Sequence, residues 1–394
     1  MEWKGKCRIK LDTGLEYGLV LEGGGARGAY QIGAWKALRE AGIKIKGVSG
    51  TSVGALNGAM ICMDDFEVAE DIWTNMHYSS VMDVQDDIME GIVRGDFKKL
   101  NPQETVKDIL KHLTDGGFDT MPLRRMIDER IPAYKIKNSK IDFYFKVFSV
   151  SGLKEMCIDA KELADEDMTN MLLASSYLPV FKRDGDLGRK LVDGGFADNL
   201  PIDALIDRGY KNIISIRIYG IGVAKKVAIP EDVNVYEIAP RIGLGSILEF
   251  DEKRTRRNIR AGYYDALRFL YDLQGTIYYI DSELSEEECL RELIRLSEAD
   301  VSKGDDREEL SLRTVTERLL PQLALQLRLG LRWDYKRLYF AMLEATAKLL
   351  KIQKYSIYTM QEFKIQIAGR WRELPDEKKE KLPDFARNAV LLCQ

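Results

Sequence analysis

A serine between two glycines is the first feature of the sequence that could carry out chemistry. Residues 50–54 read Gly-Thr-Ser-Val-Gly, a G-x-S-x-G pattern centred on Ser52. Ile43, Ile45 and Val48 predict a strand before the pattern, and a helix-forming stretch over 53–63 follows it. A serine on a tight turn between a strand and a helix holds its hydroxyl above the sheet, where it can attack a carbonyl carbon. The helix N-terminus also favours an oxygen anion, so Ser52 is expected to be a nucleophile.

A glycine-rich segment lies earlier in the chain, between an expected strand at 17–21 and an expected helix over 29–41. It reads Gly-Gly-Gly-Ala-Arg-Gly over residues 23–28. Successive small residues leave backbone N–H groups bare, so that several of them can converge on an anion. In acyl transfer that anion is the oxygen of the tetrahedral intermediate, and losing one donor raises the barrier by about 3–4 kcal/mol.

The same six residues also satisfy G-x-G-x-x-G, which is typical of dinucleotide sites. That fingerprint requires an acidic residue about 20 positions further on, at the end of the second strand. The corresponding region holds Lys44, Lys46 and Val48, and no carboxylate. The sequence therefore disfavours a dinucleotide site and favours an anion-binding loop.

A serine nucleophile needs a base, and the histidines are poorly placed to supply one. The chain has two, His77 and His112, so none occurs in the last 282 residues. In the α/β-hydrolase order the histidine follows both the serine and the acid. We expect both histidines to be exposed or capping residues at helix ends, and the base to be a carboxylate or a lysine.

The best candidate base is Asp193. It ends an apolar run and is followed by Gly194 and Gly195, so it is expected on a turn from a strand into a loop. With an ordinary pKa near 4 it would be a weak base at pH 7, so burial or a direct hydrogen bond to the Ser52 hydroxyl is required. The alternative is that its carboxylate only caps the next segment, as in an Asx-turn.

Taken together, the segments 23–28, 50–54 and 193–195 resemble the motifs of the patatin-like phospholipase family. A fourth segment, residues 174–181 (Ala-Ser-Ser-Tyr-Leu-Pro-Val-Phe), is similar to the A-S-x-x-x-P stretch of that family. The order and approximate spacing of the motifs agree across about residues 15–220. The resemblance implies a three-layer α/β/α sandwich of the patatin or cytosolic phospholipase A2 catalytic type, with a Ser-Asp dyad.

Carried over residue by residue, the resemblance implies that Ser52 is the nucleophile and Asp193 the base. It places the backbone donors of the oxyanion hole at Gly24, Gly25 and Ala26. Further positions flank these groups and are expected to support them: Gly23, Arg27, Gly28, Gly50, Val53, Gly54, Gly194 and Gly195. Val53 departs from the small residue common after the nucleophile, which should affect the shape of the pocket more than the mechanism. The scheme needs no cofactor and no metal.

The rest of the chain predicts the elements that position this site. Strand patterns alternate with helical ones, which argues for an α/β domain with a largely parallel sheet. Beyond about residue 282 strand patterns largely stop, so we expect a catalytic domain over 15–282 and a helical C-terminal appendage over 283–394. The expected strands lie at 17–21, 43–48, 143–150, 190–192, 212–218, 233–238 and 275–280.

Composition excludes several classes of protein. The 394 residues carry 59 basic and 63 acidic side chains, a net charge of −4, which argues against a dedicated nucleic-acid binder. The sequence contains no run of 18 uncharged apolar residues, so we expect no membrane span. Residues 1–14 lack the apolar core of a signal peptide. The five cysteines are scattered, as expected of reduced thiols in a cytoplasm: Cys7, Cys62, Cys157, Cys289 and Cys393.

The appendage has an uneven distribution of charge. Residues 283–310 hold eleven Asp or Glu against four Lys or Arg, whereas residues 326–355 hold seven Lys or Arg against two Asp or Glu. The basic stretch is also rich in leucine, so it could bind an anionic membrane surface at about 1 kcal/mol per basic residue. Alternatively, its apolar side chains pack internally and its charges face solvent or the acidic segment.

The function that these features favour is a serine lipid acyl hydrolase acting on phospholipids or related lipids. An acyltransferase or thioesterase using the same Ser52 is the alternative, because the acceptor of the acyl group is not visible in the sequence. An inactive scaffold is a third class, against which the intact motifs argue. The expected partner is a lipid or a membrane surface, with a cytoplasmic location and peripheral attachment; the sequence leaves the oligomeric state open.

Overall fold

The computed structural model describes residues 9–94, 117–149, 154–176, 191–193, 195, 198–301 and 312–393. The chain forms two compact units, residues 11–267 and residues 268–394, the latter together with residues 1–10. The division falls inside the long helix α12 (Glu252–Tyr271). A domain boundary at residue 282 stays a prediction.

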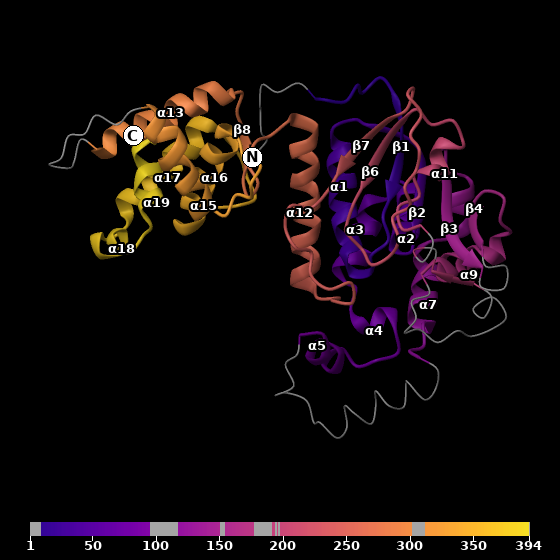
Figure 1. Ribbon diagram of the computed structural model, residues 1–394. Helices are drawn as coiled ribbons and strands as arrows, with labels where there is room; N and C mark the ends of the chain where they lie inside the picture. Colours follow the sequence, from indigo (N-terminus) through magenta and orange to yellow (C-terminus); the bar gives the residue numbers. More distant parts are fainter. Residues whose placement is uncertain are drawn as a thin grey trace. The chain divides into compact units, whose positions relative to one another are not determined.

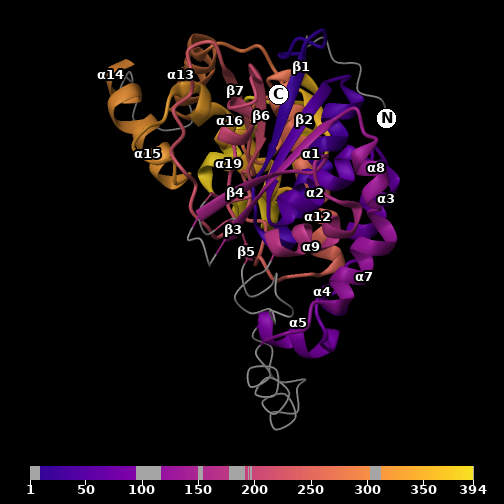
Figure 2. The ribbon, with the colours of Figure 1, turned by 90° about the vertical axis from the view of Figure 1, so that its right-hand side faces the viewer.

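The first unit is built on a seven-stranded sheet (Figures 1 and 2). The strand order is β4-β3-β2-β1-β6-β7, and β5 also pairs with β3. Neighbours within β3-β2-β1-β6-β7 run parallel, whereas β4 and β5 are antiparallel to β3. The bounds are β1 (Glu16–Leu21), β2 (Lys44–Thr51), β3 (Asp142–Ser149), β4 (Lys154–Asp159), β5 (Leu191–Asp193), β6 (Asn212–Ile216) and β7 (Asn234–Ile238).

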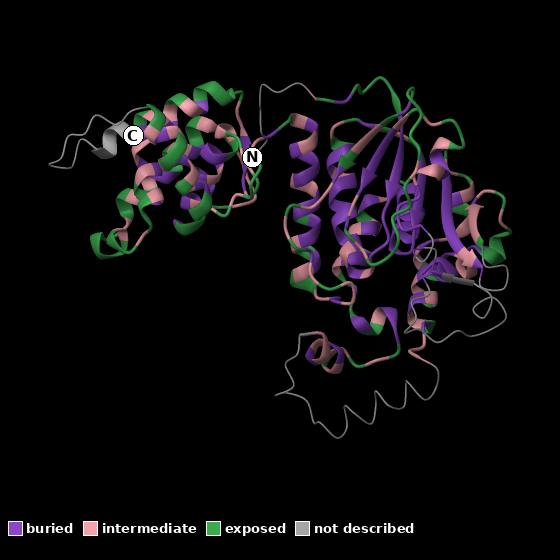
Figure 3. Cartoon of the chain, viewed as in Figure 1, coloured by how far each residue is buried: buried purple, intermediate pink, exposed green. Residues whose placement is uncertain are grey.

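Continuous apolar runs make the central strands. Leu19, Val20 and Leu21 of β1 are completely buried, as are Ile213 and Ile214 of β6. Strands of this kind must be covered on both faces, which is what helices on the two sides of a parallel sheet provide. Figure 3 shows this burial concentrated on the sheet and on the inner sides of the helices.

Helices flank the sheet, so the α/β class with a parallel-dominated sheet is confirmed. One close contact joins α1 (Ala29–Glu40) to α12, where both helices carry glycine. A Cβ atom added at Gly33 would lie 1.8 Å from the carbonyl oxygen of Ile259. A Cβ added at Gly262 would lie 1.9 Å from that of Tyr30. The other helices of this unit are α2 (Val53–Cys62), α3 (Phe66–Thr74), α4 (Tyr78–Val81), α5 (Asp86–Arg94), α7 (Met121–Arg130), α8 (Ala133–Lys137), α9 (Asp165–Ser175) and α11 (Asp203–Ile206), with the short 3₁₀ helix η1 (Gly25–Gly28).

The second unit is mostly helical, as predicted. Its helices are α13 (Glu286–Val301), α14 (Leu312–Thr314), the π-helical turn η4 (Val315–Leu319), α15 (Leu320–Gln326), α16 (Tyr335–Leu349), α17 (Met360–Glu373), α18 (Asp376–Glu380) and α19 (Asp384–Leu391). Two short parallel strands, β8 (Tyr279–Asp281) and β9 (Ile357–Thr359), join them. The strand expected at 275–280 is therefore shorter than predicted and pairs outside the main sheet. Residues 276–278 instead donate their backbone N–H groups to the buried carboxylate of Glu344.

The basic stretch 326–355 contributes most of its apolar side chains to the core of the second unit. Leu338, Phe340 and Leu343 are buried there. Leu331 is fully exposed and Leu349 is 43 % exposed. Internal packing therefore accounts for most of the leucines in this stretch, and Leu331 is the clearest exception.

Two further predictions concern membrane spans and thiols. Within the part of the chain that the structure describes, no helix has both the length and the apolar character needed to cross a membrane. Four cysteines are free there: Cys62, Cys157, Cys289 and Cys393. Cys7 lies outside the described residues.

Candidate active site

The backbone at Ser52 forms a sharp turn between β2 and α2. Its dihedral angles are φ 55° and ψ −127°, a conformation that costs free energy in any residue with a side chain. A Cβ added at Gly54 would lie 2.2 Å from the carbonyl oxygen of Leu21, and one added at Gly50 would lie 2.3 Å from that of Gly54. The two glycines of the G-x-S-x-G pattern are therefore required by close backbone approach.

Strand β3 brings Ser52 and Asp193 together from distant parts of the sequence. In the parallel pairing of β2 with β3, Thr51 is opposite Lys146. In the antiparallel pairing of β5 with β3, Asp193 is opposite Val147, the next residue of β3. Ser52, which follows the last paired residue of β2, and Asp193 of β5 therefore lie beside neighbouring residues of β3.

The side chains of Ser52 and Asp193 lie within interaction range of each other. Ser52 is 7 % exposed and Asp193 is 4 % exposed. Burial raises the pKa of Asp193 to about 6, and hydrogen bonds from the Ser52 hydroxyl and the Gly195 N–H oppose that rise. The Gly195 N–H donates to Oδ1 of Asp193 at 2.7 Å. Gly194, the other glycine expected to support this turn, lies outside the described residues.

The glycine loop is fixed beside this pair by Asn199. The N–H of Gly23 donates to the Asn199 carbonyl at 3.1 Å, and the Asn199 side-chain amide donates back to the Gly23 carbonyl at 3.0 Å. The N–H of Ala26 donates to the carbonyl of Ile247 at 2.8 Å. Among the described residues, no group accepts a hydrogen bond from the N–H of Gly24 or Gly25. These two donors remain available to an anion, whereas that of Ala26 is used.

Arg27 clamps the loop to two neighbouring segments. Its Nε donates to the carbonyl of Gly245 at 2.8 Å. Its Nη1 donates to the carbonyls of Tyr219 and Ile218. The guanidinium of this basic position therefore holds backbone in place.

Two buried amide side chains hold the ends of the glycine loop. Gln31 donates to the carbonyl of Glu22, just before the loop, at 2.7 Å. Asn57 donates to the carbonyl of Gly28, the last loop residue, at 3.0 Å and to Gln31 Oε1 at 2.7 Å. The indole N–H of Trp73 donates to Asn57 Oδ1 at 2.9 Å. No sequence pattern indicated Gln31 and Asn57, because single amides on apolar helices form no motif.

A cavity adjoins Ser52. It contains about 570 Å³ of space not filled by atoms, part of it open to solvent, and Ser52 and Gly25 line it. Its walls are largely apolar and include Leu56, Met60, Trp73, Met126 and Phe250. Its apolar walls suit a hydrocarbon chain. Val53 also lines it, which places that residue where the sequence predicted an effect on pocket shape.

The segment similar to A-S-x-x-x-P contributes a serine behind the turn. The backbone N–H of Ser52 donates to Oγ of Ser175 at 3.1 Å. The Ser175 hydroxyl in turn donates to the carbonyl of Lys146 at 2.7 Å. Residues 177–181 of the segment lie outside the described part of the chain.

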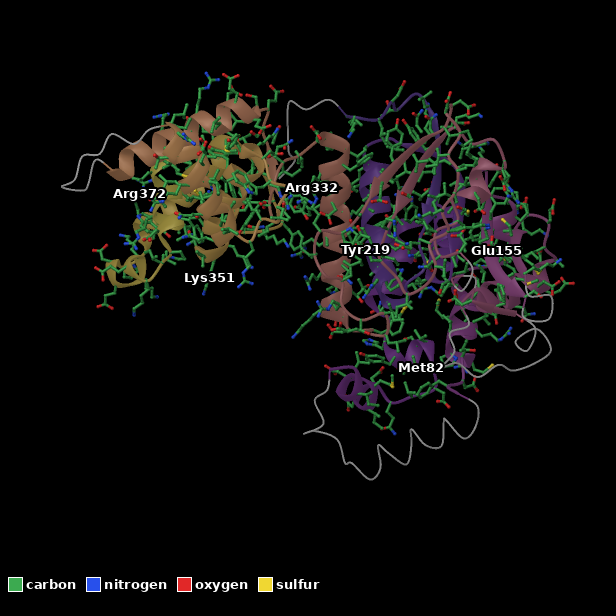
Figure 4. All side chains as sticks on the ribbon, viewed as in Figure 1. Met82, Glu155, Tyr219, Arg332, Lys351 and Arg372 are labelled. Carbon is green, nitrogen blue, oxygen red and sulfur yellow. The ribbon has the colours of Figure 1, made fainter. Side chains whose placement is uncertain are left out.

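A partly buried charge cluster lies next to the same turn. The Lys146 ammonium pairs with Glu155 and, at 3.1 Å, with Asp203; Oδ2 of Asp198 lies 4.0 Å from it. Burial raises the pKa of Asp198 to about 6. The three carboxylates are close enough to share a cation, and Lys146 supplies that positive charge. Figure 4 labels Glu155 on this side of the unit.

Neither histidine is found among the described residues of the site. His77 is exposed and immediately precedes α4, where its backbone N–H donates to Oγ of Ser80 at 3.2 Å. It is not among the residues that line the cavity. His112 lies outside the described residues. The site therefore presents a serine and an aspartate, with no histidine among its described side chains.

Comparison with known proteins places this geometry in context. Residues 19–206 match the family model described as patatin-like phospholipase. Neuropathy target esterase sws of Drosophila melanogaster is 28 % identical over 204 residues, which is 52 % of this chain and 13 % of that protein. Lysophospholipase NTE1 of Kluyveromyces lactis is 26 % identical over 226 residues, or 57 % of this chain and 14 % of that protein. The chain thus spans only a small part of the length of these relatives.

Among solved structures, VipD from Legionella pneumophila aligns over 96 % of this chain and 90 % of its own. The TM-score is 0.38 and the sequence identity is 14 %.

Proposed function

We propose that the protein is a serine lipid acyl hydrolase, because residues 19–206 match the family model described as patatin-like phospholipase. Its substrates are fatty acyl esters of phospholipids or related lipids. The observation that supports the proposal most is the interaction of the buried Ser52 hydroxyl with the Asp193 carboxylate, beside an apolar cavity.

In the first half-reaction, Asp193 accepts the hydroxyl proton while Oγ of Ser52 attacks the ester carbonyl carbon. The tetrahedral intermediate collapses and its bond to the leaving oxygen breaks. That oxygen takes the proton from Asp193, so a neutral alcohol or lysophospholipid departs and an acyl group stays on Ser52.

In the second half-reaction, water replaces the alcohol. Asp193 accepts a proton from the water as its oxygen attacks the acyl carbon. When the second intermediate collapses, the bond to Ser52 Oγ breaks and the proton returns to that oxygen. A fatty acid is released, and no cofactor or metal takes part in the scheme.

The free N–H groups of Gly24 and Gly25 support the stabilisation of the oxyanion. Preorganised backbone donors lower the barrier most when they are held rigidly before the reaction begins. Asn199, Gln31 and Asn57 provide that rigidity. Because the Ala26 N–H is taken up by Ile247, the proposed hole relies on the two glycines.

The apolar cavity is the proposed site of the acyl chain. Burying methylene groups there supplies about 0.8 kcal/mol each, which binds and orients the ester against Ser52. The names of two relatives, an esterase and a lysophospholipase, agree with an ester of a fatty acid as the substrate.

Hydrolysis of defined lipids tests this function. The purified full chain is incubated with vesicles that contain phospholipid or lysophospholipid, and released fatty acid is measured for wild type and Ser52→Ala. Ser215→Ala is a matched control, since its buried hydroxyl bonds a carbonyl between β6 and β7. We expect release by wild type and the control only.

The same assay separates the alternatives. If an added alcohol suppresses fatty acid release and yields a new ester, the protein is an acyltransferase. If acyl thioesters alone are cleaved, it is a thioesterase. Release that survives in Ser52→Ala, or none from folded wild type on any ester, contradicts the proposal.

A further inference from the structure

A residue beyond the proposed dyad controls the backbone at the nucleophile. The chain passes from the end of β2 at Thr51 to the start of α2 at Val53, with Ser52 between them. The N–H groups of a first helical turn have no partner within the helix. The pairing of β2 with β3 ends at Thr51, so the Ser52 N–H needs a hydrogen-bond acceptor outside this pairing.

Ser175 supplies that acceptor. Its Oγ lies 3.1 Å from the Ser52 nitrogen and 2.7 Å from the carbonyl oxygen of Lys146. A hydroxyl has one proton to donate, and a carbonyl can only accept. The proton of Ser175 therefore goes to Lys146, which leaves a lone pair on Oγ for the Ser52 N–H.

The hydroxyl stands where the ladder between β2 and β3 would otherwise continue. Thr51 is the last residue of β2 that pairs with β3, and its partner there is Lys146. Ser175 thus bridges an N–H of the departing chain and a carbonyl of the strand that it departs from. The bridge is inaccessible to water, since Ser175 is completely buried and Ser52 is nearly so.

We propose that Ser175 is a positioning residue that holds the Ser52 backbone in its strained turn and thereby aims Oγ at Asp193. This inference rests on the proposed function of the dyad. Without the bridge, the Ser52 N–H would be buried without a partner, and the turn would relax toward a conformation that satisfies it. A displacement of about 1 Å at a reacting atom can cost about 100-fold in rate.

The first test uses Ser175→Ala, with Ser215→Ala as the matched control for removal of a buried hydroxyl that bonds a carbonyl. For each purified full-length variant, kcat and KM on one lipid ester are measured, together with the rate of Ser52 labelling by a fluorophosphonate. We expect kcat and the labelling rate to fall at least 10-fold in Ser175→Ala only. KM and the pH midpoint should stay close to wild type, because the cavity and Asp193 are unchanged.

A second pair of variants separates the hydroxyl from packing. Threonine and valine have nearly the same shape, but only threonine retains a hydroxyl at this position. Both strain the site equally, so Ser175→Thr should label at least 5-fold faster than Ser175→Val. The melting temperatures of the pair show whether a loss reflects unfolding.

The outcomes distinguish this inference from the proposed function. If wild type turns over the ester and labels at Ser52, but Ser175→Ala behaves like Ser215→Ala, the positioning role is wrong. Equal labelling of the threonine and valine variants contradicts it as well. If wild type neither turns over an ester nor labels, the proposed function fails; in that case an unchanged amide exchange rate at Ser52 in Ser175→Ala would overturn the bridge itself.

Discussion

At the scale of single residues, burial and hydrogen bonding have opposite effects on the pKa of Asp193. Asp193 is removed from water, which raises its pKa to about 6, and a hydrogen bond from Ser52 offsets part of that cost. A carboxyl with a pKa near 6 is a better proton acceptor than an ordinary one, and it is still ionised at pH 7. The environment therefore prepares Asp193 for the role that we propose.

This pKa predicts a pH dependence of activity. Only the ionised carboxylate can accept the Ser52 proton, so kcat/KM should rise about 10-fold per pH unit below about 6 and level off above it. The profile is measured between pH 4.5 and 8.5 on a neutral ester whose own ionisation does not change. An activity that is flat across this range would contradict Asp193 as the base.

The same burial predicts a trade-off with stability. The pKa of folded Asp193 lies above its ordinary value of 3.8, so the folded state binds the proton more tightly than the unfolded state. The stability that this group contributes is present below about pH 4 and is lost as the pH rises through about 6.

Asp193→Asn removes the buried charge but keeps the shape. We expect it to abolish turnover and to raise the free energy of unfolding at pH 8 by up to about 2–3 kcal/mol. Urea unfolding at pH 8 and pH 4.5 measures the difference, which should shrink at the lower pH. A variant that is equally destabilised at both pH values would refute this account of the charge.

The sequence indicated the candidate site residues that lie in recognisable motifs, and it did not indicate supporting residues that lie outside motifs. Ser52 and Asp193 were identified from glycines around them, and the structure places their side chains in contact. Ser175 was noted only as part of a similar segment, and Gln31 and Asn57 were missed. Their importance depends on which backbone groups the fold leaves unpaired, which no local pattern reveals.

At the scale of elements, β3 is the feature that assembles the site. Thr51 of β2 pairs with Lys146 of β3, and Asp193 of β5 pairs with Val147, the next residue of β3. The sequence predicted these strands from their apolar residues. It did not predict β4, because Lys154–Asp159 is an edge strand with mostly half-buried side chains and no apolar run.

The turn after β2 predicts a sharp intolerance at one glycine. A methyl group at Gly54 would collide with the carbonyl of Leu21, whereas a methyl group at Gly243 would meet no atom within 4 Å. We expect Gly54→Ala to lower the free energy of unfolding by more than 2 kcal/mol and Gly243→Ala to change it by less than about 0.5 kcal/mol. Urea unfolding of both variants measures this, and similar midpoints would show that the backbone is not tightly packed at Gly54.

At the scale of the whole molecule, the sequence predicted a helical C-terminal part that starts after residue 282, where strand patterns largely stop and the balance of charge changes. The compact units divide at residues 267 and 268, inside a helix whose pattern is continuous. Composition could not show this, because α12 serves both units. The leucines of 326–355 mostly form the core of the second unit, which a charge count also could not reveal.

Reversible attachment to a membrane surface stays a prediction, as does the cytoplasmic location. Exposed basic residues of the second unit include Arg332, Lys351 and Arg372, labelled in Figure 4, and the fully exposed Leu331 adjoins Arg332. We expect the full chain to sediment with anionic vesicles, less so with zwitterionic ones, and to be released by 0.5 M salt. Leu331→Asp should weaken this binding, whereas Leu312→Asp, at another exposed leucine of this unit, should weaken it less. Equal binding to both vesicle types would contradict an electrostatic contribution.

Covalent labelling of the nucleophile tests the proposed Ser52–Asp193 dyad most directly. Wild type, Ser52→Ala and Asp193→Asn are treated with a fluorophosphonate, and the labelled peptide is identified by mass. We expect a label on Ser52 in wild type, no label in Ser52→Ala and a labelling rate at least 100-fold lower in Asp193→Asn. A label on another residue, or undiminished labelling of Ser52 in Asp193→Asn, would contradict the Ser52–Asp193 dyad.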